Sequence, residues 1–395
     1  MGPRVIEGRG DLSWSKENIF VTGASGFIGG RVCERLVQIG ARHVTALIHN
    51  PSHAVRIARL PIRMCSGDLL DRKSLRNLVG EARIVIHLGI GYGGAIVKGT
   101  RNILEASLHS RVHRFVHMST AAVYGLKPNP RRITEDAPLR CTGNVYCDSK
   151  MRAERLVARF HREGLPVVTL RPSIVYGPYS RWCTRLIQAL GHGTGILIDG
   201  GTGVCNTTFV DNLVDSIFLS IERQEAIGES LFVTDGEHVT WADFIGAHAA
   251  MITPRPILAN ISSAEIIEQY KSRPGLWRSS WIELRRLLYS REFRGMAKQI
   301  PLFDSLFQRL WYYFQSLTEQ QRERLRMRIE GSKSSKQNTR IHRQSNPDLD
   351  TLAIQTGTVL FSIDKARRIL GYEPRVRFSE GMRLTERWLR FANYL

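Results

Sequence analysis

Short apolar runs alternate with amphipathic helical patterns along the first 180 residues. The apolar runs are typical of buried β-strands and occupy residues 18–24, 43–50, 63–71, 83–90, 114–125 and 167–177. Helical spacing of apolar residues between them is clearest at 29–40, 99–110 and 149–164. Strands that alternate with helices predict parallel βαβ units, and therefore an α/β fold with a doubly wound parallel sheet.

The alternation of strands and helices becomes less regular after residue 180, which indicates that further structural parts follow the first domain. We expect residues 1–180 to form a Rossmann-type α/β domain whose sheet is completed by parts of 205–235. Compact α/β patterns at 181–252 and 359–395 predict a smaller C-terminal substrate lobe. Residues 253–358 are rich in Arg and aromatic residues and mostly helical in pattern, so they read as an additional helical insertion.

One stretch of the insertion, residues 301–328, combines an apolar helical face with arginines. A helix packed on the substrate lobe is the favoured interpretation, because aromatic stripes at helical spacing are usually core. A weak contact with an anionic membrane surface is the alternative.

The composition is that of an ordinary globular protein. Of 395 residues, 43% are hydrophobic and 23% are charged, which argues against a mainly disordered chain. No run approaches the ~18 apolar residues that cross a bilayer, and the N-terminus lacks the apolar core of a signal peptide. Neither the six cysteines nor the twelve histidines have metal-ligand spacing. We therefore expect free thiols, no metal site and a cytoplasmic protein.

The charge balance is less ordinary. The chain has 56 Lys and Arg against 36 Asp and Glu, a net charge of +20. Such a field attracts anions, which include phosphorylated cofactors, acidic lipids and nucleic acid. No recognition helix, RNP motif or zinc knuckle is visible, so we expect no nucleic-acid partner.

A glycine-rich turn joins the first predicted strand to the first predicted helix, in the sequence Thr22-Gly23-Ala24-Ser25-Gly26-Phe27-Ile28-Gly29. In this context Gly23 permits the tight turn, and Gly26 lets the backbone approach a pyrophosphate. Gly29 lets the helix pack close to the sheet. The helix N-terminus then presents unpaired N–H groups to phosphates. The turn predicts a dinucleotide site.

The end of the second strand bears on which nicotinamide cofactor is used. A carboxylate there would bind the ribose 2′-OH and favour NAD, but the residues are Ile48, His49 and Asn50, with Arg56 nearby. We therefore favour NADP(H) over NAD(H). Asp68 ends the third strand, where it could reach the adenine amine or merely cap a turn.

A Tyr–Lys pair begins the helical stretch after residue 145. Tyr146 and Lys150 are four residues apart and share one helix face. An ammonium beside a phenol favours the phenolate, so we expect the pKa of Tyr146 to be lowered toward that of a working acid–base group. Thr120, at the end of the preceding strand, could bond the substrate oxygen. The three residues predict proton transfer at a hydroxyl or carbonyl group.

The sequence resembles the extended short-chain dehydrogenase/reductases, the NAD-dependent epimerase/dehydratase superfamily. The resemblance is carried by VTGASGFIGG, GDLLD, VIHLGI, GTRNILEAS, RFVHMSTAAVYG, YCDSK, LRPSIVYGP and SIDKARRILGYEP, and covers residues 18–252 and 359–395. It implies a Rossmann fold, a nicotinamide cofactor, the catalytic set Thr120, Tyr146 and Lys150, and by analogy a homodimer. It implies cofactor contacts from Gly23, Ser25, Gly26, Phe27, Ile28, Gly29, His49, Asp68, Leu69, Leu88, Gly89, Tyr146, Lys150, Pro172 and Ile174.

Departures from the family pattern bear on the substrate. Sugar dehydratases usually carry Asp-Glu directly after the catalytic Thr, where this chain has Ala121 and Ala122, so dehydration is not expected. The usual Asn and Arg of nucleotide-sugar epimerases are replaced by Ile174 and Cys205. The leading hypothesis is hydride transfer at a secondary alcohol or ketone carbon of a sugar-like substrate. The alternatives are a ketoreductase for a hydrophobic alicyclic substrate, resembling 3β-hydroxysteroid dehydrogenases and dihydroflavonol reductases, and a non-catalytic dinucleotide sensor.

Overall fold

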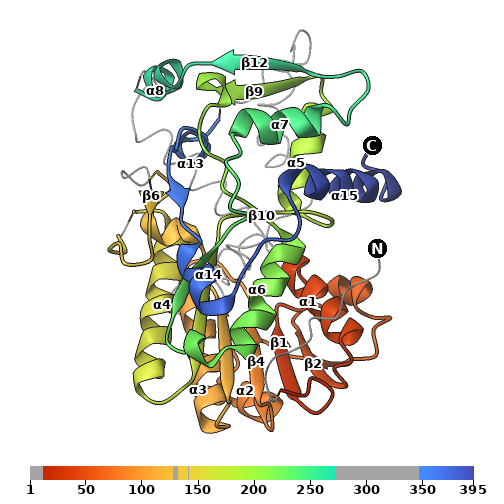
Figure 1. The fold of residues 1–395 in the computed structure, drawn as a ribbon, viewed down its shortest axis with the longest axis vertical. Helices are drawn as coiled ribbons and strands as arrows, with labels where there is room; N and C mark the ends of the chain where they lie inside the picture. Colours follow the sequence, from red (N-terminus) through yellow and green to blue (C-terminus); the bar gives the residue numbers. More distant parts are fainter. Residues whose placement is uncertain (1–11, 128–131, 141, 272–346) are drawn as a thin grey trace, which may run out of the picture. The chain divides into compact units, whose positions relative to one another are not determined.

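A seven-stranded parallel sheet forms the centre of the fold (Figure 1). The computed structural model describes residues 12–127, 132–140, 142–271 and 347–395. The strand order is β11-β7-β5-β4-β1-β2-β3, and every neighbouring pair is parallel. The strands are β1 (Asn18–Thr22), β2 (His43–Ile48), β3 (Arg63–Ser66), β4 (Ile84–His87), β5 (Arg114–Met118), β7 (Val167–Pro172) and β11 (Ser230–Val233). The predicted doubly wound sheet is confirmed.

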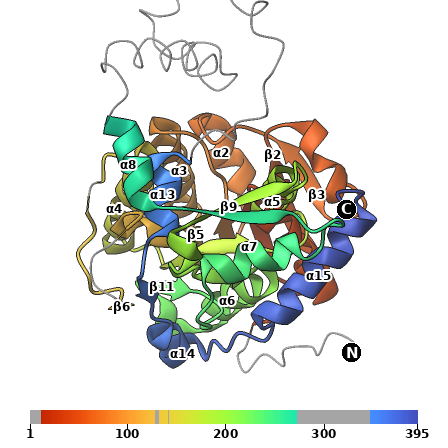
Figure 2. The same ribbon diagram turned by 90° about the horizontal axis from the view of Figure 1, so that it is seen from above.

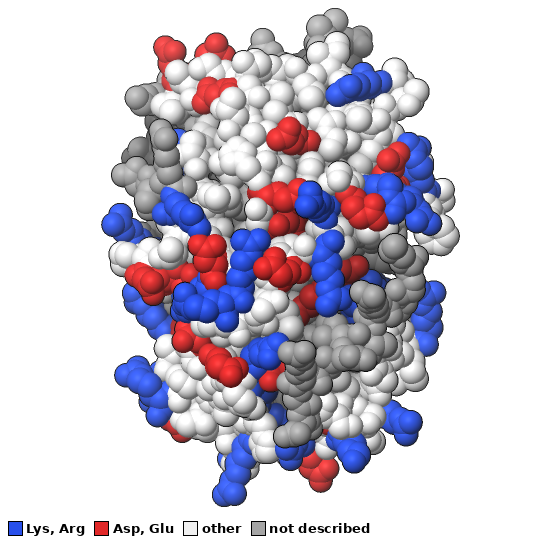
Figure 3. All heavy atoms as spheres, viewed as in Figure 1, with Lys and Arg blue, Asp and Glu red and all other residues white. Residues whose placement is uncertain are grey.

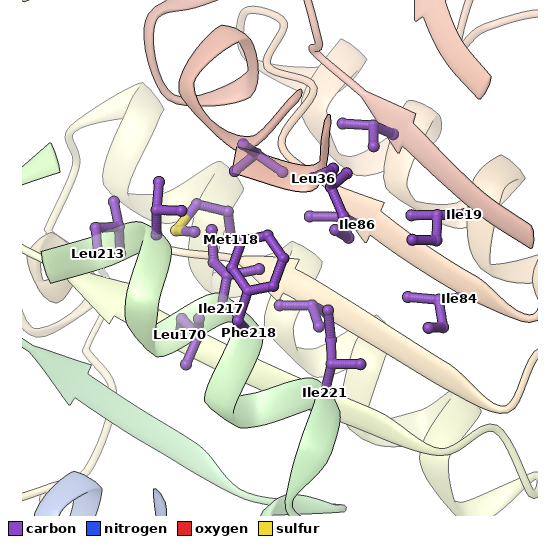
Figure 4. Close-up of a cluster of buried hydrophobic side chains, with 14 of the residues drawn as sticks. Ile19, Leu36, Ile84, Ile86, Met118, Leu170, Leu213, Ile217, Phe218 and Ile221 are labelled. Carbon is purple, nitrogen blue, oxygen red and sulfur yellow. The ribbon is translucent and has the colours of Figure 1, made fainter. Parts of the chain in front are cut away.

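Helices cover both faces of the sheet because alternate strand residues point to opposite sides. On one face, Ile19 of β1 and Ile86 of β4 pack in the same core as Leu36 and Ile217, from helices α1 (Phe27–Gln38) and α6 (Val210–Glu222) (Figure 4). On the other face, Phe20 packs with side chains of α2 (Arg72–Val79), α3 (Gly94–His109) and α4 (Val145–Arg162). Burial on both faces explains why the strands read as continuous apolar runs.

The predicted strand at 167–177 is in fact two strands. The chain leaves the main sheet at Ser173, and β8 (Ile174–Tyr176) pairs instead with β10 (Thr207–Phe209). Buried aromatic residues around Tyr176, including Trp241 and Phe244, form the core of the remaining elements. These elements are α5 (Arg181–Leu190), β9 (Thr194–Ile198), α7 (Trp241–Ala249), β12 (Ile257–Ile261) and α15 (Phe378–Phe391).

The chain divides into two compact units, one of residues 1–263 with 349–395 and the other of residues 264–348. Within the segment from residue 253 that the sequence predicts to be mostly helical, residues 257–261 form strand β12, which lies parallel beside β9 (Figure 1, Figure 2). Helix α8 (Ser263–Lys271) follows. The expected helix at 301–328 lies outside the described residues.

The C-terminal part of the first unit returns to the sheet domain. It contains α13 (Leu349–Gln355), β13 (Leu360–Phe361) and α14 (Asp364–Leu370). Strand β13 pairs with β6 (Arg132–Ile133), and α14 packs against β11 and α6. Residues 349–358, which the sequence assigned to the insertion, therefore belong to the first compact unit.

Charged side chains of both signs are interspersed on the face seen in Figure 3, where Lys and Arg lie beside Asp and Glu. Ion pairs among the described residues include Arg83 with Glu17 and Arg132 with Asp364. Within the described ranges, no helix is both long enough and apolar enough to span a bilayer.

Candidate active site

The carboxyl ends of the parallel strands meet at one edge of the sheet, and the predicted site residues follow those ends. Thr22 ends β1, His87 ends β4, Met118 ends β5 and Pro172 ends β7. In open α/β sheets, ligands bind in the crevice at this edge. The fold thus brings the glycine turn, Thr120 and the residues after Pro172 to one edge of the sheet.

The glycine turn has the conformation that its sequence predicts. Gly23 has φ +68°, and a Cβ at this position would lie 2.6 Å from the carbonyl oxygen of Leu88. A Cβ on Gly29 would lie 2.1 Å from the carbonyl oxygen of Gly23. Only glycine fits both positions, because any side chain would overlap backbone atoms. The turn is therefore packed tightly against the end of β4 and the start of α1.

The N-terminus of α1 fits a pyrophosphate group. Gly26 is the N-cap residue, no side chain caps the helix, and its first turn contains no acid. Gly26 is exposed, and Ser25, Phe27 and Ile28 are partly exposed. Unpaired N–H groups and the positive end of the helix dipole favour an anion at such a place.

A buried network around His87 stabilises the neighbouring strand end. The hydroxyl of Thr22 and Nδ1 of His87 share a hydrogen bond of 2.8 Å, and the same hydroxyl accepts from the backbone N of Gly89 at 3.1 Å. Nε2 of His87 lies 3.2 Å from the hydroxyl of Thr100. Burial lowers the pKa of His87 to about 3, so its ring is neutral. Leu69 packs here too, since a Cβ on Gly89 would lie 2.5 Å from its Cδ1.

The adenosine end of the predicted site corrects one expectation. Arg56 does not offer a free guanidinium to a 2′-phosphate, because Nε and NH2 donate to Glu34 at 2.8 and 3.0 Å and NH1 donates to the carbonyl oxygen of Phe27 at 3.0 Å. Its guanidinium also lies 4.0 Å from the ring centroid of Tyr179. Arg56 therefore braces α1.

His49 and Asp68 lie close together beyond β2 and β3. His49 Nδ1 is 3.9 Å from Oδ2 of Asp68, and both side chains are well exposed. Oδ1 of Asp68 accepts from the backbone N of Leu70 at 2.9 Å, so Asp68 caps this turn. Its second oxygen, Oδ2, is the one that faces His49.

The predicted Tyr–Lys segment begins helix α4. Asn144 caps the helix, with Oδ1 accepting from the backbone N of Tyr146 at 3.0 Å and of Cys147 at 3.1 Å. Nδ2 of Asn144 donates to Asp350 of α13 at 2.9 Å. The cap therefore fixes both the start of the helix and its attachment to a distant segment.

The expected lowering of the Tyr146 pKa is wrong for the protein alone. The residue is 37% exposed, but its hydroxyl end is buried and shares a hydrogen bond with the hydroxyl of Thr120. Burial raises the pKa of Tyr146 to about 12 and outweighs the opposing effect of that hydrogen bond. Tyr146 is therefore a protonated phenol at neutral pH. Thr120 itself also accepts from the backbone N of Ala122 at 3.2 Å.

Lys150 is buried and held by the sheet. It is 5% exposed, and its ammonium donates to the carbonyl oxygen of Met118 at 2.9 Å. Burial lowers the pKa of Lys150 to about 8, while the carboxylate of Glu154 acts in the opposite direction. The described structure brings Thr120, Tyr146 and Lys150 together at the end of β5.

A cavity of about 90 Å³, which we call the inner cavity, adjoins Thr120. Its lining is largely apolar, and none of the described residues around it carries a charged side chain. The lining residues are Thr120, Ala122, Gly125, Leu126, Ser173, Ile174, Val204, Asn206, Trp241, Ile354, Gly357, Val359 and Phe361. Pockets of this kind bind apolar groups and fix their orientation through a few polar atoms.

A wider opening, which we call the outer cleft, shares Gly125 and Leu126 with the inner cavity. Its volume is about 980 Å³, and its lining residues are Tyr92, Tyr124, Gly125, Leu126, Lys127, Arg140, Thr142, Gly143, Asn144, Val145, Tyr146, Asp350 and Ala353. The Nζ of Lys127 donates to Thr356 at 3.0 Å, and Arg140 is exposed with no ion-pair partner among the described residues. Tyr146 thus lines a cleft whose wall also carries the cationic side chains of Lys127 and Arg140.

Sequence reasoning missed the C-terminal wall of the inner cavity. Nε1 of Trp241 donates to the carbonyl oxygen of Ile354 at 3.1 Å. Nδ2 of Asn206 donates to the carbonyl oxygen of Val359 at 2.8 Å. Of the predicted nicotinamide-flanking residues, Ile174 lines the cavity, while Pro172 pairs with β11. No local sequence signal marks 354–361 as part of the site.

Two curated enzymes illustrate the sequence similarity of this chain to known proteins. The 4-hydroxy-2-methyl-3-oxo-4-farnesyl-3,4-dihydroquinoline-1-oxide ketoreductase of Stigmatella aurantiaca is 29% identical over 237 residues, which cover 57% of this chain and 70% of that protein. The dTDP-glucose 4,6-dehydratase of Streptomyces antibioticus is 32% identical over 255 residues, covering 58% and 75%.

Solved structures share the fold. UDP-glucuronic acid 4-epimerase from Bacillus cereus, in complex with NAD, has a TM-score of 0.64 at 20% identity, covering 95% of this chain and 99% of that one. The model of the NAD dependent epimerase/dehydratase family matches residues 19–233, more than half of the chain. The chain therefore belongs to the NAD dependent epimerase/dehydratase family.

Proposed function

We propose that the protein is an NAD(P)-dependent ketoreductase that interconverts a ketone and a secondary alcohol on a substrate with an apolar body. The observation that carries this proposal is the inner cavity beside Thr120, whose described lining has no charged side chain. A sugar presents hydroxyl groups on every side, and an apolar wall would leave them without hydrogen-bond partners. The apolar lining therefore favours a hydrophobic substrate over a sugar-like one.

The residues around the cavity have the chemistry that ketone reduction needs. Thr120 would orient the carbonyl oxygen, and the phenol of Tyr146 would donate the proton to that oxygen. A pKa of about 12 keeps Tyr146 protonated, which suits an acid in the direction of reduction. A bound nicotinamide supplies the hydride for the carbonyl carbon. Lys150 would then stabilise the phenolate that remains after the proton has left.

The glycine turn would hold the cofactor. Its pyrophosphate would lie at the N-terminus of α1, beside Gly26. A preference for NADP(H) is supported by His49, which is exposed where NAD enzymes of this fold place an acid. A lower NADP(H) affinity in His49→Ala, with NAD(H) affinity unchanged, is expected from binding titrations. If His49→Ala loses the same affinity for NAD(H) as for NADP(H), His49 does not give a preference for NADP(H).

Two residues after Thr120 argue against dehydration of a sugar. Ala121 and Ala122 form the start of the 3-10 helix η2 (Ala121–Tyr124), and Ala122 lines the inner cavity. A carboxylic acid at this place would be needed to protonate a departing hydroxyl. Neither alanine can do so.

A nucleotide-sugar substrate is the second candidate, because the outer cleft carries Lys127 and Arg140. Two cations at the mouth of a site could bind a diphosphate. Calorimetry with UDP and dTDP separates the two proposals. The ketoreductase proposal predicts that neither nucleotide competes with an apolar ketone.

The substrate class can be tested by narrowing the inner cavity. Ala122→Leu is expected to raise the KM for ketones with a bulky apolar group and to change the KM for small ketones much less, since the added methyl groups occupy the cavity. Ala58→Leu, at an exposed position after η1 (Pro51–Arg56), is the matched control. A KM that rises equally for bulky and small ketones would contradict the assignment of the cavity.

A further inference from the structure

A buried ion pair lies directly behind the proposed catalytic residues. Glu154 follows Lys150 by one helical turn on α4, and Arg171 lies next to the end of β7. Nε and NH2 of Arg171 donate to the two carboxylate oxygens of Glu154 at 3.0 and 2.6 Å. The two side chains are only 6% and 5% exposed. A pair with this bidentate geometry is directional as well as strong.

The pair also reaches the loop after Thr120. NH1 of Arg171 donates to the hydroxyl of Tyr124 at 2.6 Å, and that hydroxyl donates to the carbonyl oxygen of Glu135 at 3.0 Å. The guanidinium carbon of Arg171 lies 5.3 Å from the Tyr124 ring centroid. Tyr124 ends η2, whose N-cap is Thr120. One guanidinium therefore joins α4, β7 and η2.

The charges near Lys150 are unequal. Lys150 and Arg171 are buried cations, and Glu154, on the same helix as Lys150, is the buried anion. His87 on β4 and His117 on β5 also face Lys150, but burial keeps both rings neutral. On its own helix Lys150 has Tyr146, which is a neutral phenol. Burial lowers the pKa of Lys150, and the carboxylate of Glu154 opposes that effect to an extent that depends on how far Arg171 neutralises it.

We propose that Glu154 and Arg171 are a positioning pair, which sets the charge state of Lys150 and fixes the η2 segment that carries Thr120. The proposal rests on the proposed function, because it takes Lys150 and Thr120 as working residues. The pair itself touches neither substrate nor cofactor in this account.

Removing the two partners one at a time should move Lys150 in opposite directions. Glu154→Gln removes the carboxylate and leaves Arg171 unpaired, so the alkaline limb of the kcat/KM profile should move to lower pH by about one unit, a roughly tenfold loss above that limb. Arg171→Met removes the cation that neutralises Glu154, so the carboxylate should raise the pKa of Lys150. The alkaline limb should then move to higher pH by a similar amount. A merely structural pair would give losses without opposite shifts.

Two further variants make the result independent of folding defects. Glu154→Gln leaves the buried guanidinium of Arg171 without a carboxylate and could unfold the protein. The double variant Glu154→Gln with Arg171→Met removes both charges and should return the limb close to the wild-type position. Glu163→Gln removes an exposed partner of Arg159 on the same helix, 2.8 Å away, and should leave the profile unchanged.

A readout without turnover separates this proposal from the proposed function. The Lys150 side-chain signal in the NMR spectrum, assigned with Lys150→Met, can be titrated in the cofactor-free protein and in each variant. Opposite displacements in the two single variants, with recovery in the double variant, support the pair even if no ketone is reduced. Displacements in the same direction, or none, overturn it even if ketones are reduced.

Discussion

The ammonium group of Lys150 donates a hydrogen bond of 2.9 Å to the carbonyl oxygen of Met118, the last residue of β5. This contact attaches the catalytic helix to the strand end from which Thr120 follows two residues later. It also holds a charge in a buried position, which lowers the pKa of the lysine to about 8. The position of Lys150 therefore destabilises the folded protein while its ammonium is protonated.

Replacing this lysine should stabilise the fold and abolish activity. The gap between an ordinary lysine pKa of 10.5 and about 8 corresponds to roughly 3 kcal/mol against the charged form. Replacing the lysine removes this penalty, but the Met118 carbonyl then loses its hydrogen-bond donor, at a cost of about 1 kcal/mol. We expect Lys150→Met to raise the free energy of unfolding by about 2 kcal/mol at pH 7 in urea titrations.

The pH dependence of this difference has a definite sign. Between about pH 8 and pH 10.5 the unfolded wild type binds more protons than the folded one, so the stability of the wild type rises relative to the variant. The advantage of Lys150→Met should be complete below about pH 8 and should turn into a deficit of about 1 kcal/mol above pH 10.5, where only the loss of the donor to the Met118 carbonyl remains. An advantage that is constant across this range would show that Lys150 titrates normally.

The glycine turn should not tolerate a single methyl group at Gly29. A Cβ there would lie 2.1 Å from the carbonyl oxygen of Gly23, so the turn or α1 must shift. We expect Gly29→Ala to lower the free energy of unfolding by about 1–3 kcal/mol and to weaken binding of NADH or NADPH in fluorescence titrations.

Gly246 is the matched control for this substitution. It lies inside helix α7, and a Cβ there would meet no atom within 4 Å. Gly246→Ala should stabilise the protein by about 0.5–1 kcal/mol and leave cofactor affinity unchanged. If Gly29→Ala binds the cofactor as tightly as the wild type does, the glycine turn is not part of the cofactor site.

The contact between Asn144 and Asp350 can be tested by exchanging their groups. Asn144→Asp keeps an N-cap oxygen for α4 but places a carboxylate against Asp350, where the amide now donates at 2.9 Å. We expect a loss of about 1 kcal/mol of stability and a raised KM, because α13 lines the outer cleft.

Adding Asp350→Asn to that variant returns one donor and one acceptor to the pair. The double variant should therefore regain most of the stability and the KM, as measured in the same urea and kinetic assays. If it behaves like Asn144→Asp alone, the two residues do not depend on each other.

Local patterns explain why the sheet and the catalytic helix could be predicted from the sequence. Burial on both faces makes each strand an apolar run, and the glycine turn lies between one strand and the next helix. Tyr146 and Lys150 lie one helical turn apart, so their proximity follows from spacing alone. Glu154 lies one turn further on the same helix and could have been found by extending that reasoning.

Features that depend on distant packing could not be predicted. Trp241 and Ile354 are separated by 113 positions, and Asn206 and Val359 by 153, so no periodicity reveals the cavity wall that they build. Arg56 pairs with Glu34, which is 22 residues away on α1, and no spacing pattern reveals that contact. The pKa of Tyr146 depends on burial of its hydroxyl, which spacing does not give.

Tyr146→Phe removes the hydroxyl group that would donate the proton to the ketone. Turnover of an apolar ketone and cofactor affinity should be measured together, with Tyr394→Phe as a control because Tyr394 is 41% exposed, close to the 37% of Tyr146. If Tyr146 donates the proton, Tyr146→Phe should lose turnover by about 100- to 10,000-fold while cofactor affinity stays within about twofold. Turnover close to that of the wild type and of Tyr394→Phe would contradict it.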